Sequence, residues 1–190
     1  MQDFFKQLDY SYLLYLLMSA VPALLCITIH ESAHGLAAWL LGDDTARAQG
    51  RISLNPLRHI DPVGLLMLAV AHFGWAKPVS INPANFKNPK LGMAVTALAG
   101  PVSNFILWGI LTAITPLLTN QLAYTLVYLT AQLSWGLGVF NLIPIPPLDG
   151  SKVLFSFLPN KAYFTLMRYE KYGMPVILLG ILALRYFGGS

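Results

Sequence analysis

The chain has 190 residues, about the length of one domain, and only 11% of them are charged while 56% are hydrophobic. A chain this short cannot hide so much apolar side chain in its own interior, so the composition argues against a soluble enzyme and a disordered tail. With Cys26 as its single cysteine, the chain cannot form an intrachain disulfide. The mean hydropathy of +0.59 favours a polytopic membrane protein.

The net charge of +4 does not indicate a nucleic-acid partner. The basic residues flank apolar runs, as membrane topology requires, and they form no continuous basic stripe. We therefore expect a lipid bilayer as the surroundings of this chain and no nucleic acid.

Four apolar runs set the predicted architecture, and no linker divides them into separate domains. We expect an all-α polytopic membrane protein that forms one domain over residues 1–190. Its transmembrane helices are predicted at residues 10–41, 91–118, 122–145 and 173–187.

The segment 42–90, between the first two runs, has a mixed character. Residues 49–54 predict a short strand, whose edge could hold an extended substrate by strand addition. Residues 62–75 are apolar but too few for a full crossing, which favours an interfacial or re-entrant position.

The basic residues choose between the possible topologies. If residues 62–75 do not cross the bilayer, ten of the twelve lysines and arginines share one side, in segments 42–90 and 148–171. The positive-inside rule makes that side the cytoplasm and places the N-terminus outside. If residues 62–75 did cross, the basic residues would be divided between the two faces.

The first apolar run ends with the motif His30-Glu31-Ser32-Ala33-His34. On a helix, residues four apart lie on one face, so both imidazoles can bind a single zinc ion. Glu31 is displaced around the helix, where its carboxylate can reach a metal-bound water and act as a general base. Ionisable residues within a membrane helix are costly, which favours a functional site over a merely structural one.

A catalytic zinc needs a third protein ligand. The candidates in the sequence are Asp43, Asp44, Asp61, Asp149, His59 and His72. Asp149 is the only acidic residue that borders the third apolar run. In the topology in which residues 62–75 do not cross, Asp149 and the two histidines lie at a similar depth on the same side.

Three motifs in order resemble the site-2 protease family of intramembrane zinc metalloproteases. They are His30-Glu31-x-x-His34, the Ala99–Asn104 sequence AGPVSN, and the Asn141–Gly150 sequence NLIPIPPLDG. The segments GRISLNP, HIDP and FGWAKP within residues 50–78 are similar to the compact bacterial branch, without PDZ or CBS domains.

The resemblance implies one zinc per chain, held by His30, His34 and Asp149, with Glu31 as the general base. It implies an endopeptidase that cleaves transmembrane segments of other proteins, or bonds near them. The implied location is a bacterial inner membrane, with the active site toward the cytoplasm. The amides of Asn104 and Asn141 are candidates for holding the substrate or an oxyanion, or for fixing helix packing.

A non-proteolytic zinc-binding protein or a zinc transporter is the alternative function. A transporter would need ligands along the depth of the membrane, but only Asn104, Gln132 and Asn141 are strongly polar within the other predicted spans. Glu31 would also have no role in a carrier. The sequence gives no oligomeric state.

Overall fold

The structure, a computed structural model, describes residues 10–71, 75–173, 175–176 and 179–180. Its α-helices are α2 (Tyr10–Leu40), α3 (Thr45–Ala48), α4 (Pro62–Ala71), α5 (Pro89–Ile114), α6 (Gln121–Asn141), α7 (Asp149–Ser156) and α8 (Asn160–Tyr169). Short 3-10 turns are η1 (Pro56–Arg58), η2 (Pro83–Asn85), η3 (Thr115–Leu117) and η4 (Glu170–Tyr172). The described part of the chain is therefore all-α.

Helices α5 and α6 begin where the sequence supplies side-chain caps. The Asn88 side chain accepts a hydrogen bond from the Leu91 N–H, and Pro89 occupies the first turn of α5, where a missing N–H costs nothing. Asn120 caps α6 in the same way through the Ala123 N–H. These caps fix the start of both helices independently of the surroundings.

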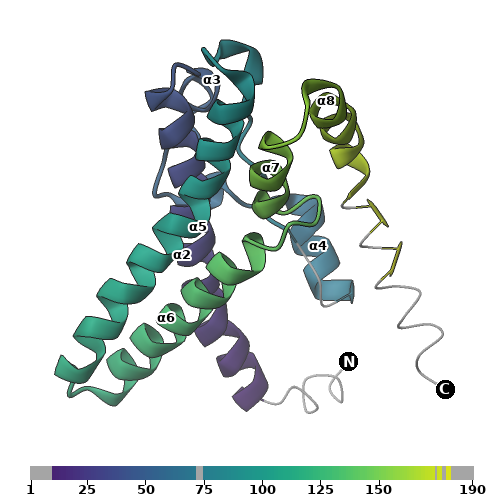
Figure 1. Cartoon of the computed structure of the whole chain (residues 1–190). Coiled ribbons are helices and arrows are strands. Elements are labelled where there is room, and N and C mark those ends of the chain that lie inside the picture. Colours follow the sequence, from purple (N-terminus) through teal and green to yellow (C-terminus); the bar gives the residue numbers. More distant parts are fainter. Residues whose placement is uncertain (1–9, 72–74, 174, 177–178, 181–190) are drawn as a thin grey trace.

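Helix α5 is the centre of the fold, because it packs against α2, α6 and α7. The buried residues between these helices are mostly small, including Ala38, Ala94, Ala97 and Ala131. Small residues let helix backbones approach closely, which is how helices associate when the solvent is lipid. Figure 1 shows the start of α2 and the α5–α6 connection at the same end of the bundle, with α3, α7 and α8 toward the other.

One described helical stretch, Pro89–Leu117, is long and apolar enough to cross a bilayer by length and composition, with a hydropathy of 1.6. Helix α4 has ten residues and covers about 15 Å, half of a hydrocarbon core of about 30 Å. The predicted run at 173–187 lies largely outside the described residues.

The predicted strand at 49–54 is wrong. These residues form turns and irregular chain, and the pairing in the described segment 42–90 is an isolated antiparallel bridge between Ile60 and Ala76. Gly50 has a positive φ of 63°, which interrupts an extended run. The hypothesis that this strand offers its edge to a substrate therefore loses its basis.

The segment 42–90 is held by the hydrogen bonds of two buried side chains and not by strand pairing. Arg51 donates hydrogen bonds to the carbonyl oxygens of Arg58, Lys77 and Pro78. Asp43, which is fully buried, accepts hydrogen bonds from Thr45, Asn82 and Asn85. Side chains thus satisfy backbone groups that strand partners would otherwise satisfy.

Candidate metal centre

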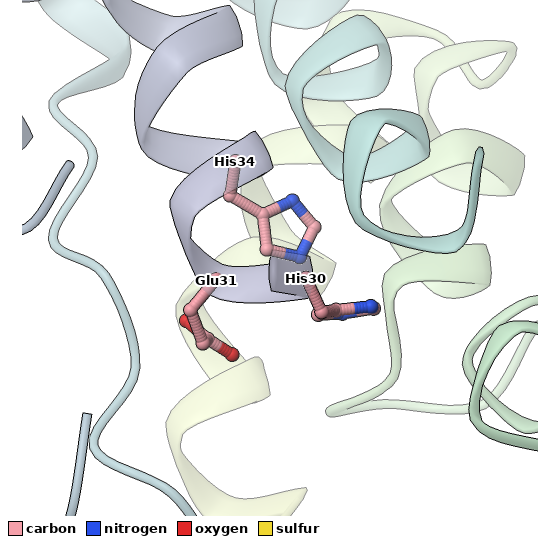
Figure 2. A group of neighbouring side chains, drawn as sticks. All are labelled: His30, Glu31 and His34. Carbon is pink, nitrogen blue, oxygen red and sulfur yellow. The ribbon is translucent and has the colours of Figure 1, made fainter. Parts of the chain in front are cut away.

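The motif at the end of α2 brings two imidazoles and a carboxylate together. His30 and His34 are 4% and 6% exposed, and the ligand atoms of His30, Glu31 and His34 lie within 4.8 Å of one another. Figure 2 shows Glu31 leaving the helix on a different side from the two histidine rings. The local 3.6-residue period of the helix is enough to produce this arrangement.

Asp149, the first residue of α7, meets the two histidines from 119 residues away in the sequence. Its Oδ2 atom lies 3.1 Å from His30 Nε2 and 3.2 Å from His34 Nε2. Two ligand atoms on a tetrahedral zinc with bonds of about 2.0–2.1 Å lie about 3.3 Å apart. The three side chains therefore have the spacing of a zinc ligand set.

The chain between α6 and α7 explains how Asp149 reaches this position. Helix α6 ends at Asn141, and the proline-rich residues 142–148 form turns. A Cβ atom at Gly150 would lie 2.1 Å from the Leu142 carbonyl oxygen, so only glycine lets α7 begin directly against these turns.

The hydrogen bond of His34 to the backbone directs its other ring nitrogen at Asp149. The His34 Nδ1 atom lies 2.7 Å from the Thr96 carbonyl oxygen, an acceptor, so Nδ1 carries the hydrogen. A neutral His34 then presents a lone pair on Nε2 to a carboxylate oxygen 3.2 Å away. Two acceptors at this distance repel each other, so either a proton on Nε2, which makes His34 a donor to Asp149, or a metal ion lies between them.

His30 has a buried amide behind it. Asn104 is 0% exposed, and its Nδ2 lies 3.2 Å from His30 Nδ1. Its Oδ1 atom is buried without a hydrogen-bond partner. When Nε2 of His30 binds a metal, Nδ1 carries the hydrogen and needs an acceptor, which this oxygen can provide after rotation of the amide. The residues present therefore fit zinc.

The carboxylate of Asp149 is kept ionised by its surroundings. Burial alone would raise its pKa, but hydrogen bonds from His30 and His34 and the nearby charge of Lys152 hold the pKa of Asp149 well below its ordinary value. An ionised carboxylate is the form that binds a metal.

The Glu31 carboxylate is fixed by a hydrogen bond from the backbone of the segment 42–90. The Val79 N–H donates to Glu31 Oε2 at 2.9 Å. The two residues line a cavity of about 140 Å³, with room for a few water molecules. The cavity is lined by His30, Glu31, His34, Pro78, Val79, Ile81, Met93, Ala97, Asn141, Pro147, Asp149 and Lys152.

The two predicted amides have different positions. Asn141 lines the cavity and donates to the Leu137 carbonyl oxygen within its own helix. Asn104 lies behind His30, fully buried, with Ser134 donating to its backbone carbonyl oxygen. The position of Asn104 favours orientation of His30 over contact with a substrate, because the ring separates its amide from the cavity.

The other candidate ligands lie elsewhere or outside the described residues. Asp43 is enclosed by its own hydrogen bonds, Asp61 caps α4 through the Val63 N–H, and Asp44 pairs with Arg47 on the surface. The remaining histidine of the described chain, His59, bonds to the Ser53 carbonyl oxygen. His72 lies outside the described residues.

Three features of the site were missed by the sequence-based reasoning. They are Lys152 in the cavity wall, the Val79 N–H on Glu31, and Gly100 beneath the histidines. Signals existed for Lys152, which follows Asp149 by three residues and so shares its helix face, and for Gly100, which belongs to the AGPVSN motif.

Comparisons with known proteins point to zinc metalloproteases. Residues 115–184 match the model of Peptidase family M50. The chain is 38% identical over 172 residues to "Putative zinc metalloprotease YwhC" of Bacillus subtilis, covering 84% of this chain and 77% of that protein. It is 30% identical over 167 residues to "Putative zinc metalloprotease Rip2" of Mycobacterium tuberculosis, covering 84% of this chain and 64% of that protein.

A third relative, "Zinc metalloprotease MJ0392" of Methanocaldococcus jannaschii, is 37% identical over 76 residues, 40% of this chain and 22% of that protein. No solved structure matches the chain significantly. The chain belongs to Peptidase family M50, the site-2 proteases. It is a zinc metalloprotease, a hydrolase of peptide bonds, in a family of membrane proteases.

Proposed function

We propose that this chain cleaves peptide bonds in or next to transmembrane segments of other membrane proteins, with one zinc held by His30, His34 and Asp149. The observation that carries the proposal is the position of Asp149 Oδ2, 3.1 and 3.2 Å from the two imidazole nitrogens. Glu31 stands beside them in the same cavity, as a general base requires.

The residues of the site have separate roles in this reaction. Bound zinc polarises the scissile carbonyl and makes a water more acidic. Glu31 takes a proton from the attacking water and later gives it to the leaving amine. The Val79 N–H holds one oxygen of Glu31, so the carboxylate stays aimed into the cavity. Asn104 orients His30, and Asn141 offers its side chain to the substrate at the cavity wall.

We propose that the chain is a single domain that crosses the membrane with α2, α5, α6 and the run at 173–187, while residues 42–90 stay on one side. Ten of its twelve basic residues then face the cytoplasm. The bundle supports this topology, because the start of α2 and the α5–α6 connection lie at the same end (Figure 1). The site then opens toward the cytoplasmic face of a bacterial inner membrane.

Zinc content and cleavage of a model transmembrane substrate, measured together in detergent, test the proposal. We expect one zinc per chain in the wild type and in Glu31→Gln, with cleavage lost in the variant. Asp149→Ala should lose both zinc and cleavage. Asp44→Ala, which removes an exposed carboxylate, is the matched control and should change neither.

Three outcomes would count against the proposal. Full retention of zinc in Asp149→Ala would contradict the ligand set. Undiminished cleavage by Glu31→Gln would contradict the general base. Zinc bound without cleavage of any transmembrane substrate would favour the alternative, a non-proteolytic zinc protein or transporter.

A further inference from the structure

Lys152 is the charged group of the cavity wall that is neither a metal ligand nor the general base. It lies on α7, three residues after Asp149, and lines the same cavity as the two histidines and Glu31. Its Nζ atom is 3.6 Å from Asp149 Oδ1, the oxygen turned away from the histidines, and 3.2 Å from Glu170 Oε1. Its side chain is 20% exposed.

The chain around Glu170 fixes this ammonium from the other side. Glu170 begins the turn η4, and Gly173, just after that turn, lies against the proline turns. A Cβ atom at Gly173 would be 3.0 Å from the Pro147 nitrogen. Pro147 itself lines the cavity. The turn that carries Glu170 is therefore packed on the wall of the site, and it holds Lys152 where it is.

Stability does not explain a charged pair in this position. Replacing a largely buried ion pair by apolar groups of similar size is often neutral or stabilising. The side chains of Lys152 and Glu170 are only 20% and 19% exposed. Their ion pair therefore stabilises the fold little more than well-packed apolar side chains would. The pair is more simply explained by a task that needs a positive charge in the cavity.

Hydrolysis of a peptide bond creates such a need. When water attacks, the π electrons of the carbonyl move to its oxygen, and this negative charge is stabilised by donors fixed in advance. Among the described donors near the cavity, the Val79 N–H bonds to Glu31, the Asn141 amide donates one of its two N–H groups to Leu137, and Asn104 lies behind His30. Lys152 is the cation that lines this cavity.

We propose that Lys152 is a catalytic residue that holds the scissile carbonyl oxygen and stabilises the oxyanion, and that Glu170 is its positioning residue. The inference rests on the proposed function. Lys152 exchanges no proton: the oxygen of water forms a bond to the carbonyl carbon, the oxyanion collapses to restore the C=O bond, and the C–N bond breaks. The leaving amine receives its proton from Glu31.

The test compares Lys152→Met with Lys161→Met, which removes the same group from an exposed position on α8. We expect Lys152→Met to lower kcat about 100- to 1000-fold on a model transmembrane substrate, with KM within a few-fold and one zinc per chain. Lys152→Arg, which keeps the charge, should retain more of the activity. Lys161→Met should cleave like the wild type.

A double variant separates catalysis from charge balance. If Lys152 only neutralises Glu170, Lys152→Met combined with Glu170→Gln should cleave at the wild-type rate. If the ammonium acts on the carbonyl, the double variant should stay as slow as Lys152→Met, and Glu170→Gln alone should lose about tenfold. The double variant removes the Glu170 carboxylate together with the Lys152 ammonium, so neither charge of this pair is left buried alone. It should therefore fold even where Lys152→Met does not.

Wild-type kcat in Lys152→Met, or wild-type kcat in the double variant, would overturn the inference. Loss of zinc from a folded Lys152→Met would also overturn it, because Lys152 would then serve the metal site and not the carbonyl. Glu31→Gln in the same assay judges the proposed function independently, since its loss of cleavage does not depend on Lys152.

Discussion

The two halves of α5 have opposite surroundings. In the half near the metal centre, a Cβ atom at Gly100 would lie 2.5 Å from His34 Nε2 and 2.6 Å from His30 Cε1. In the other half, a Cβ atom at Gly109 would meet nothing within 4 Å, and Ile106 and Ile110 are 58% and 56% exposed. One continuous helix is thus a close wall of the catalytic site and, farther along, an apolar surface suited to lipid.

Helix propensity and hydropathy do not reveal which half of α5 forms part of the catalytic site. Both halves are apolar, and both contain a glycine that weakens the helix by about 1 kcal/mol relative to alanine. What differs is the tertiary partner: imidazole rings at Gly100, open surroundings at Gly109. Variants at Gly100 and Gly109 test that difference.

Gly100→Ala should have the largest effect. The new methyl group would push on both imidazoles, and a displacement of about 1 Å in a catalytic site can cost about 100-fold in rate. We expect cleavage to fall by at least about that factor, together with weaker zinc binding. Gly109→Ala, on the same helix, should keep full activity and gain a little stability. Equal activities of the two variants would contradict the comparison.

Asn104→Ala should weaken zinc binding about 10- to 100-fold, because partners that orient a metal-binding histidine contribute this much to affinity. Zinc affinity measured by competition with a chelator is the direct readout. Asn120→Ala, which removes an exposed cap of α6, is a suitable control and should leave the zinc affinity unchanged. An unchanged affinity in Asn104→Ala would show that the amide does not position His30.

Asp43 tests the polar contacts that hold the segment 42–90 against the end of α2. Burial would raise the pKa of Asp43, but hydrogen bonds from Thr45, Asn82 and Asn85 lower it below the ordinary value of about 4. Because the folded-state pKa is lowered, the stabilisation is complete above the unfolded-state pKa and declines as the pH falls through the folded-state value.

Asp43→Asn should therefore unfold more easily at pH 7, by about 1–3 kcal/mol, because hydrogen bonds to a charged acceptor are lost. Thermal unfolding in detergent should show the difference from wild type shrinking as the pH falls below about 4. Asp44→Asn, at an exposed carboxylate, should show no such difference. A difference in stability between wild type and Asp43→Asn that stays constant with pH would mean that the charge of Asp43 does not stabilise the fold.

The long helices could be predicted closely from their apolar runs. The runs at 10–41, 91–118 and 122–145 correspond to α2, to α5 with η3, and to α6, with ends that differ by a few residues. The strand at 49–54 failed, because Arg51 satisfies distant carbonyl oxygens, a contact that a propensity rule does not contain. The role of Asn104 was ambiguous for the same reason, since its partner is 74 residues away.

The sequence by itself determined the zinc-binding face of α2, because the positions of His30, Glu31 and His34 follow from the local period of one helix. It also predicted the three long helices to within a few residues, but it placed the end of α6 at residue 145, four residues beyond Asn141. The packing of the helices, in contrast, brings the Asp149 carboxylate to the two imidazoles, places Gly100 under them, and pairs Glu170 with Lys152. These contacts join separate segments, and the packing of the helices, not the spacing of residues along the chain, sets their distances.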